Sequence, residues 1–386
     1  MLTMGVEEEF FLLDQDGALA PKSGDVTRLA AAGREVTTEY MAYQVETATP
    51  VCTRLDELRS ELLRLRLVTA GAAEQAGVRL VAAGAAPSTG GPLGAHTDHD
   101  RYRKRAHRYP DATAIGGTCA CQVHVGIPDR ELAVDVVTRL RPWLPTLLAL
   151  TTNSPFAGRV DSGWCSTRYR SQRRWPTFRP PAGWINATRY DEDVRRLIAR
   201  GAAMDPASIY FLARLSARYP TVEVRVADAC LTVEDAVLHA AVVRALVMSL
   251  VEDARRGRPV PATPQDRIST GLLAAARHGM SGPAAGLHTA PKSIARALVT
   301  RLLQKITPAL AETGDLDEVR NGLDRLCRDG TGADRQRALR AGSATVEQFV
   351  AALAERTVPR TESVPADRSP RVPADVGVAN DRCAPW

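Results

Sequence analysis

Short stretches of alternating apolar and polar residues recur along the chain and predict β-strands. The clearest is Thr221–Val226, in which three valines alternate with Thr221, Glu223 and Arg225. Because successive strand side chains point to opposite faces, the valines bury in a core while the polar residues project to the other side. A one-residue slip would invert both faces, so this register is strongly specified.

Other extended stretches carry polar residues in a similar arrangement. Glu7 and Glu9 share one face of their strand, and Gln122 and His124 share one face of another. Glu46 lies among apolar neighbours in a third. Besides Thr221–Val226, the predicted strands are Gly5–Leu13, Ala42–Thr47, Val78–Ala83 and Cys121–Val125.

Helical spacing occupies much of the remainder. Thr53 with Asp56 and Thr232 with Asp235 resemble helix N-cap signals, each followed by apolar residues at helical spacing. Strands and helices are mixed without regular βαβ alternation, which favours an α+β fold. The predicted helical regions run from about residue 55 to Ala76, over Val134–Asn153 with a break near Pro142, from about residue 233 to Arg256, and over Asp266–Ala354 with breaks.

Composition narrows the class of protein. The 386 residues are 45% hydrophobic and 24% charged, which is ordinary for a globular protein. The net charge of +6 suits nucleic acid, membrane surfaces or small anions such as nucleotides, or reflects an arginine-rich coding bias. Seven cysteines without a CxxC pair favour a reduced, cytosolic protein.

The chain ends and the apolar runs are informative as well. The first residues do not have the pattern of a signal peptide, since Glu7 follows almost at once. The longest apolar run, Ala236–Val251, contains His239 and Arg244 and is too short to span a bilayer. Pro, Arg, Ser and Asp dominate from about Thr357, which predicts disorder.

The candidate chemistry comes from carboxylates that share a sheet face. Such groups repel one another unless a cation neutralises them, and carboxylate oxygens with one histidine suit Mg²⁺ or Mn²⁺. Arginines beside them suit phosphate. The alternative is that these glutamates and arginines form exposed salt bridges on the polar face of an antiparallel sheet. Spacing alone leaves both readings open.

Several segments resemble motifs of the carboxylate–amine ligase family, the type-2 glutamate–cysteine ligase group often called YbdK-like. The resemblance runs in order from about residue 4 to 355, and its motifs are specific only together. They are Gly5–Phe10, Gln44–Pro50, Asn153–Phe156, Ser166–Arg168, Cys121–Gly126, Arg218–Asp228 and Gly330–Arg337.

This resemblance implies a glutamine-synthetase-like architecture, in which a curved antiparallel sheet forms a funnel with helices on its outer face. It implies one catalytic domain over residues 1–355, followed by a disordered tail over 356–386. The implied reaction uses ATP and Mg²⁺, with Mn²⁺ as a substitute. ATP activates an amino-acid carboxylate, glutamate in glutamate–cysteine ligases, as an acyl phosphate that an amine such as cysteine attacks.

The resemblance also assigns residues. The implied metal ligands are Glu7, Glu9, Glu46, His124 and Glu223. The arginines implied to contact phosphate or the substrate carboxylate are Arg225, Arg168 and Arg214, with Arg218 as a weaker candidate. Arg335 and Arg337 are expected to close over the nucleotide, and the Arg/Trp-rich segment Ser154–Trp184 is the candidate lid.

One position departs from the family pattern, which commonly reads His-Val-His-Val-Gly. Here Gln122 replaces the first histidine, and glutamine cannot act as a base or imidazole ligand. The basic run Arg101–Arg105 is expected to be a solvated face.

Other functions stay open. One is a phosphotransferase of the guanidino-kinase type, and another is a non-catalytic binder of nucleotides or nucleic acid. Under the ligase hypothesis the partners are a nucleotide, an amino acid and an amine, without nucleic acid or membrane. A homo-oligomer is among the expected states, because sheets of this kind often associate.

Overall fold

A seven-stranded antiparallel sheet lies at the centre of the computed structural model, which describes residues 1–88, 91–281, 283–284 and 293–358. The strand order is β2-β3-β1-β5-β9-β8, and β4 pairs with the end of β1. The sheet strands are β1 (Met4–Leu13), β2 (Val36–Thr38), β3 (Gln44–Ala48), β4 (Arg79–Val81), β5 (Ala120–Gly126), β8 (Ala213–Leu215) and β9 (Thr221–Asp228). Two small ribbons pair β6 (Phe156–Ala157) with β7 (Val160–Asp161) and β10 (Pro283–Ala284) with β11 (Ser293–Ile294).

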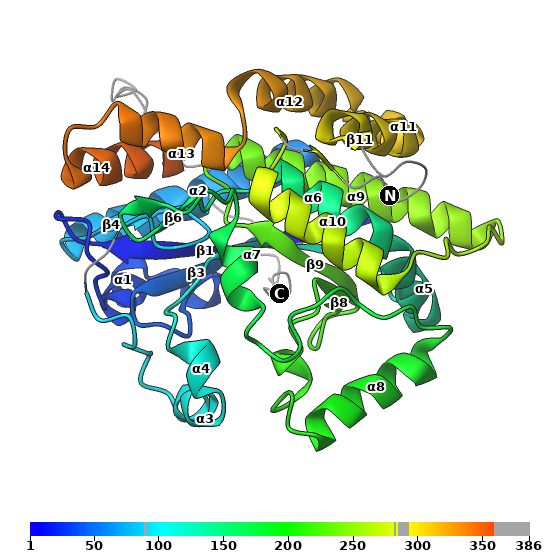
Figure 1. Ribbon diagram of the computed structural model, residues 1–386, viewed down its shortest axis with the longest axis horizontal. Coiled ribbons are helices and arrows are strands. Elements are labelled where there is room, and N and C mark those ends of the chain that lie inside the picture. Colours follow the sequence, from blue (N-terminus) through cyan, green and yellow to red (C-terminus); the bar gives the residue numbers. More distant parts are fainter. Residues whose placement is uncertain (89–90, 282, 285–292, 359–386) are drawn as a thin grey trace, which may run out of the picture.

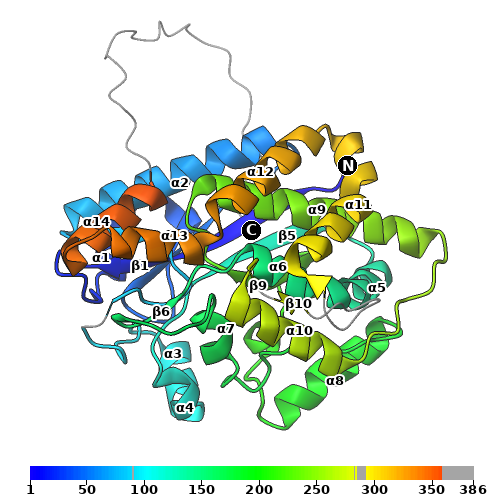
Figure 2. The same cartoon turned by 45° about the horizontal axis from the view of Figure 1, so that its top comes forward.

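Helices pack against one face of this sheet (Figures 1 and 2). The inner layer is formed by α2 (Leu55–Gln75), α5 (Arg130–Leu140), α6 (Leu144–Leu150) and α9 (Val233–Arg255). Outside them lie α10 (Gln265–His278), α11 (Ala295–Thr313) and α12 (Leu316–Asp329), while α13 (Gly332–Ala341) and α14 (Val346–Thr357) cover the β4 end. The remaining helices are α1 (Ser23–Ala30), α3 (Asp100–Arg108), α4 (Pro110–Thr113), α7 (Thr167–Gln172) and α8 (Ala187–Ala199).

Alternation along the strands separates an apolar face from a polar one, as predicted. The three valines of β9 are fully buried in the core beneath the helices. On the opposite face the strand register sets His124 beside Glu223 and Glu9 beside Glu46. We call the helix-covered side the back of the sheet and the other side its front.

The predicted mixed α+β architecture is confirmed, and so are the main elements. The N-cap signal at Thr232 is a capping box with Asp235 at the start of α9. At α2 the cap differs from the prediction, because Glu57 accepts from the Thr53 and Arg54 backbone amides.

The sequence did not predict the helices α1, α3, α4, α7 and α8, or the strands β2, β6, β7, β8, β10 and β11. All are short or strongly polar, so their hydrophobic periodicity is weak. The helix α14 runs to Thr357, slightly past the predicted domain boundary. The prediction of a disordered tail falls almost entirely on residues 359–386, which lie outside the described residues.

No helix within the described residues is both long and apolar enough to cross a membrane. The six cysteines in the same part of the chain are all free of disulfides.

Candidate functional site

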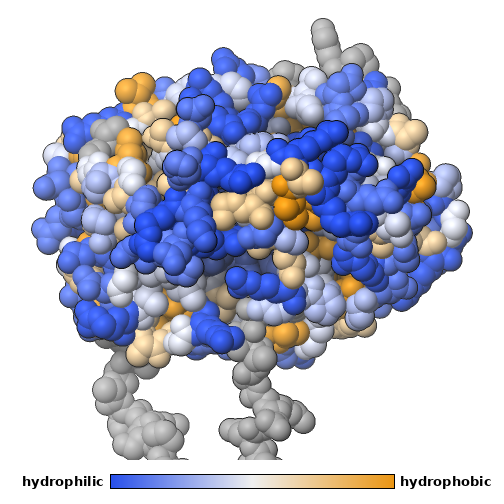
Figure 3. All heavy atoms as spheres, turned by 90° about the horizontal axis from the view of Figure 1, so that it is seen from below, coloured by the Kyte–Doolittle hydropathy of each residue, from blue (hydrophilic) through white to orange (hydrophobic). Residues whose placement is uncertain are grey.

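A cleft of about 430 Å³ opens on the front of the sheet. Its floor is the polar face of the central strands, and its walls come from α3, α7 and the segments that precede β8 and β9. Figure 3 shows the molecule from the side of α3 and α8, where the surface is largely hydrophilic around a small hydrophobic group. The predicted convergence of separate polar strands therefore occurs at one concave site.

Three of the predicted metal ligands meet on the floor of this cleft. Glu7, His124 and Glu223 come from three adjacent strands, and one ligand atom of each lies within 4.8 Å of the others. The His124 Nε2 atom lies 3.6 Å from Glu7 Oε1, while its Nδ1 atom lies 2.9 Å from Thr221 Oγ1. Two carboxylates and an imidazole at this spacing match the donor set of a Mg²⁺ or Mn²⁺ site.

A second acidic group lies next to the first. Glu9 and Glu46 face each other across β1 and β3, and Glu39 lines the same part of the cleft. Burial, with repulsion from Glu39, raises the pKa of Glu9 to about 7. Burial also raises the pKa of Glu46 well above its ordinary value, and Glu7, Glu39 and Glu9 add to the effect. Carboxylates held this close repel one another, and a bound cation would relieve that repulsion.

Glu223 is held between two arginines. Its carboxylate accepts from Arg214 Nε at 2.8 Å and Nη2 at 3.1 Å, and also from Arg225. Burial alone would raise the pKa of Glu223, but Arg214 and Arg225 hold it well below its ordinary range. Since Glu223 is only 2% exposed, these contacts are not the solvated salt bridges of the alternative reading.

Gln122 links the two acidic groups. Its side-chain amide donates to Glu9 Oε1 at 2.9 Å, and its carbonyl oxygen accepts from Arg225. At 2% exposure it is buried in the floor of the cleft. Gln122, the residue that departs from the family pattern, therefore orients the Glu9 carboxylate and the Arg225 guanidinium. A side-chain amide can fill this role without an imidazole.

Arg168 enters the cleft from the first turn of α7. Its guanidinium donates to the backbone carbonyls of Val226 and Arg225 at 3.2 and 3.1 Å. Burial lowers the pKa of Arg168, although Asp228 acts in the opposite direction. Its Nε atom has no hydrogen-bond partner among the described residues, so one donor of a buried cation is left for an anion.

A wall that the sequence did not reveal comes from α3. The predicted solvated run does expose Arg103 and Lys104, but Arg101 and Arg105 line the cleft, which corrects that expectation. The Arg105 guanidinium carbon lies 4.7 Å from the centre of the Tyr40 ring and 5.6 Å from each of three other rings. These rings belong to Tyr102, Trp175 and Tyr210.

The segment Ser154–Trp184 forms a packed wall. Trp175 is 8% exposed and lines the cleft together with Phe178. Trp184 is buried elsewhere, against Tyr190.

Of the remaining predicted arginines, one lies at the rim of the cleft and two lie outside it. Arg218 is exposed at the rim of the cleft. Arg335 and Arg337 lie outside the cleft, where Arg335 donates to Asp235 at 2.6 Å and Arg337 donates to Asp161 at 2.7 Å. Neither arginine lines the cleft, so the structure does not support the expectation that they close over a nucleotide bound there.

The sequence of the chain is similar to those of known proteins of one family. The profile of the glutamate–cysteine ligase family 2 (GCS2) matches residues 3–355. A protein of Mycobacterium sp. (strain KMS) named "Putative glutamate--cysteine ligase 2-2" is 42% identical over 359 residues, covering 92% of this chain and 98% of its own. A protein of the same name from Saccharopolyspora erythraea is 41% identical over 370 residues, covering 93% of each chain.

Solved structures share the fold at low sequence identity. A bifunctional glutathione synthetase from Pasteurella multocida matches 92% of this chain and 52% of its own, with a TM-score of 0.68 at 15% identity. The glutamate–cysteine ligase of Francisella tularensis in complex with AMP matches 92% and 88%, with a TM-score of 0.62 at 14% identity. The protein is thus an enzyme of the carboxylate–amine ligase class. Within that class, the chain belongs to the glutamate–cysteine ligase family 2.

Proposed function

We propose that the protein uses ATP and Mg²⁺ to join an amino-acid carboxylate, glutamate by family, to an amine such as cysteine. The observation that carries this proposal is the cleft itself, in which acidic side chains and arginines converge from separate strands. Carboxylates suit cations, and arginines suit the phosphates and carboxylates that such a reaction brings together. The family assignment supports the ligase reaction.

The residues of the floor fit a divalent cation. Glu7, His124 and Glu223 would hold one ion, and Glu9 with Glu46 would hold another beside it. Glu223 can share its carboxylate between its arginines and an ion, because each carboxylate oxygen has more than one lone pair. Bound cations would neutralise the charge that builds up when a carboxylate approaches a triphosphate.

Activation of the carboxylate proceeds by phosphoryl transfer. A carboxylate oxygen attacks the γ-phosphorus of ATP, the bond to the bridging oxygen breaks, and ADP leaves. Arg168 and Arg225 face the cleft and would stabilise the transferring group, while Arg214 orients Glu223. The amine nitrogen then attacks the acyl carbon, phosphate leaves, and the nitrogen loses a proton.

The acyl phosphate must be kept from water, and the walls of the cleft suit that role. Trp175 and Phe178 contribute buried aromatic surface on one side. Arg105, stacked among aromatic rings with its Nε unpaired within the described residues, would bind a carboxylate of the amino-acid substrate. Arg218 at the rim would contact the nucleotide.

Other expectations of the family remain part of this proposal. We propose that the sheet curves into a funnel, that residues 1–355 form one catalytic domain, and that the protein acts in the cytoplasm on small molecules. The unpaired cysteines of the described chain support a reducing compartment.

The test is an assay of ADP release by the purified protein with ATP, Mg²⁺, glutamate and a panel of amines. The proposal predicts ADP and phosphate in amounts equal to an amide product that mass spectrometry detects. A stable phosphorylated product without an amide would instead identify a guanidino-kinase type of phosphotransferase. The absence of substrate-dependent ADP release across the panel would overturn the proposal.

A further inference from the structure

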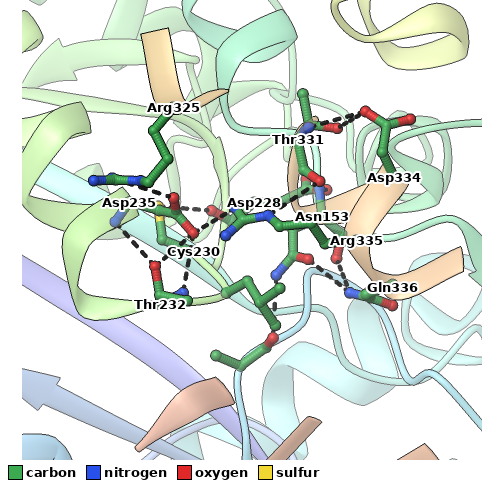
Figure 4. A network of polar contacts seen from close by, with 12 residues as sticks. Asn153, Asp228, Cys230, Thr232, Asp235, Arg325, Thr331, Asp334, Arg335 and Gln336 are labelled. Atoms are coloured by element: carbon green, nitrogen blue, oxygen red, sulfur yellow. Dashed lines mark hydrogen bonds and ion pairs between the residues drawn. The ribbon is translucent and has the colours of Figure 1, made fainter. Parts of the chain in front are cut away.

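A buried polar network lies beside the cleft, where β9 ends, and part of it is drawn in Figure 4. At its centre is Asp228, which is fully buried. One carboxylate oxygen accepts from the Asn153 amide at 2.9 Å and from Ser154 Oγ at 2.6 Å, and the other accepts from Ser166 Oγ at 2.8 Å. Gly84 leaves room for this carboxylate, since a Cβ atom there would lie 2.5 Å from Asp228 Cγ.

Helix α13 contacts this network at Asn153, through Gln336 and Gly332. Gln336 Nε2 donates to the Asn153 backbone oxygen at 2.8 Å and to its Oδ1 at 2.7 Å. A Cβ atom at Gly332 would lie 2.3 Å from the same Oδ1, so the helix can approach this closely only with glycine there. Asn153 in turn donates to the carbonyls of Ala82 and Ala229 at 3.1 and 2.8 Å. Asn153 is thereby fixed between α13 and the strand ends.

On its other side the network reaches Arg168. Ser154 Oγ accepts from the Arg168 amide at 3.2 Å while it donates to Asp228. Ser166 caps α7, because its Oγ accepts from the Tyr169 amide at 3.1 Å while it too donates to Asp228. The Arg168 guanidinium itself lies 3.8 Å from the Asp228 carboxylate. Both the backbone and the side chain of Arg168 are therefore set by Asp228.

Arg168 connects this network to the cleft. It is 5% exposed and lines the cleft, and its Nε donor is unsatisfied within the described part of the chain. An unpaired buried donor on a guanidinium is costly unless an anion accepts from it. The direction in which this donor points decides whether the anion is bound in a reactive position.

We propose that the Gly330–Arg337 segment is a brace that positions Arg168 from outside the cleft, at the end of β9, acting through Gln336, Asn153 and Asp228. Arg335 and Arg337 of this segment were expected to contact the nucleotide. In this proposal the segment instead acts indirectly, through the residues that hold Arg168. Gln336 is a positioning residue, since it does not line the cleft. This inference rests on the proposed function for its kinetic readout, and on structure alone for its second readout.

The kinetic test compares two variants of α13. Gln336→Met keeps the side-chain size but loses both hydrogen bonds to Asn153. The matched control is Arg340→Gln, which changes an arginine of the same helix that donates to the Ser343 carbonyl. Because small misplacements of a positioning group are costly, we expect Gln336→Met to lower kcat by roughly tenfold, with KM for ATP changed less than about twofold. Arg340→Gln should leave both constants unchanged.

A double-mutant cycle separates positioning from stability. In an Arg168→Lys background, the kcat effect of Gln336→Met should disappear, because the group it positions is already altered. An equal kcat effect in both backgrounds would overturn the proposal, as would a variant that lowers the unfolding temperature with normal kcat. If Gln336→Met does not fold, Ser166→Ala breaks the same network at α7 and carries the same expectations.

The second readout does not depend on activity. Hydrogen exchange should be faster at the Arg168 and Tyr169 amides in Gln336→Met than in the wild type. Loss of the Gln336 bonds frees Asn153, which donates to Asp228, and so loosens the Asp228 carboxylate that holds their acceptors Ser154 and Ser166. Unchanged exchange there would overturn the brace. A wild type that releases no ADP would contradict the proposed function and leave this measurement standing.

Discussion

Glu8 and Glu9 are neighbours on β1, yet they lie on opposite faces of the sheet and in opposite electrostatic conditions. Glu8, on the back, is 1% exposed and paired with Arg66 at 2.6 and 3.0 Å. Arg66 gives its remaining donors to backbone carbonyls, including that of Thr357. Glu9, on the front, faces Glu46 across the sheet.

The difference teaches how to recognise the working face of this protein. Both carboxylates are buried, so burial does not separate them. What separates them is the partner of each carboxylate: Glu8 at the back is paired with the Arg66 guanidinium, while Glu9 at the front faces another carboxylate, Glu46, across β1 and β3. Two carboxylates that the fold holds together are prepared for a ligand of opposite charge.

The largest expected effect is on stability, at the back of the sheet. Glu8→Gln leaves the Arg66 guanidinium buried without its carboxylate, so we expect unfolding free energy to fall by roughly 3–5 kcal/mol. Urea unfolding measures the loss. The folded fraction should keep its kcat within about twofold. A kcat loss comparable to that of a front-face variant would erase the distinction between the two faces.

A pH dependence is expected from His239, which is also at the back. Neither of its ring nitrogens has a partner in residues 1–88, 91–281, 283–284 and 293–358, and burial lowers its pKa to about 4. The unfolded chain, with a pKa near 6.5, binds the proton first as the pH falls. Stability is therefore full above pH 6.5 and declines towards pH 4, by roughly 3 kcal/mol in total.

The measurement compares unfolding free energies of the wild type and His239→Leu at pH 7 and pH 5. The wild type should lose about 2 kcal/mol more than the variant over this interval. Equal losses would show that His239 is not buried in its neutral form.

At the front, Glu46→Gln should separate activity from stability. Removing one of several mutually repelling carboxylates should leave unfolding free energy unchanged or raise it by roughly 0.2–1 kcal/mol. The same change should reduce kcat by on the order of 100-fold, because a cation ligand is lost. Thermal unfolding and steady-state kinetics measure both. A destabilised but fully active variant would contradict the proposed role of Glu46.

The smallest effect is expected for Arg335→Gln. This variant breaks a partly exposed ion pair with Asp235, so stability should fall by about 1 kcal/mol or less. The KM for ATP should stay the same, because Arg335 does not line the cleft. A several-fold rise in that KM would restore the original expectation of a nucleotide contact.

The sequence predicts well wherever alternation is strong. In β9 the valines fix which face is buried, and this places Glu223 and Arg225 on the opposite face. In β1 the same logic correctly pairs Glu7 with Glu9. Strand order and register, which bring these side chains together, required the tertiary structure or the family resemblance.

The failures have a common cause. Helix α3 is strongly polar, so nothing in its sequence distinguishes Arg105 in the cleft from Arg103 in solvent. Glu39 follows a three-residue strand that carries no usable pattern. For α13 the helical periodicity was correct, but a local pattern does not reveal which part of the fold a helix contacts, here Asn153 rather than the cleft.

The most direct test of the central claim is to soak crystals of the wild type with Mn²⁺ and a non-hydrolysable ATP analogue and to collect anomalous diffraction data. We predict an anomalous peak between Glu7, His124 and Glu223, with the phosphates of the analogue and the Arg168 guanidinium beside it. Nucleotide bound elsewhere, with no peak among these three residues, would contradict the account.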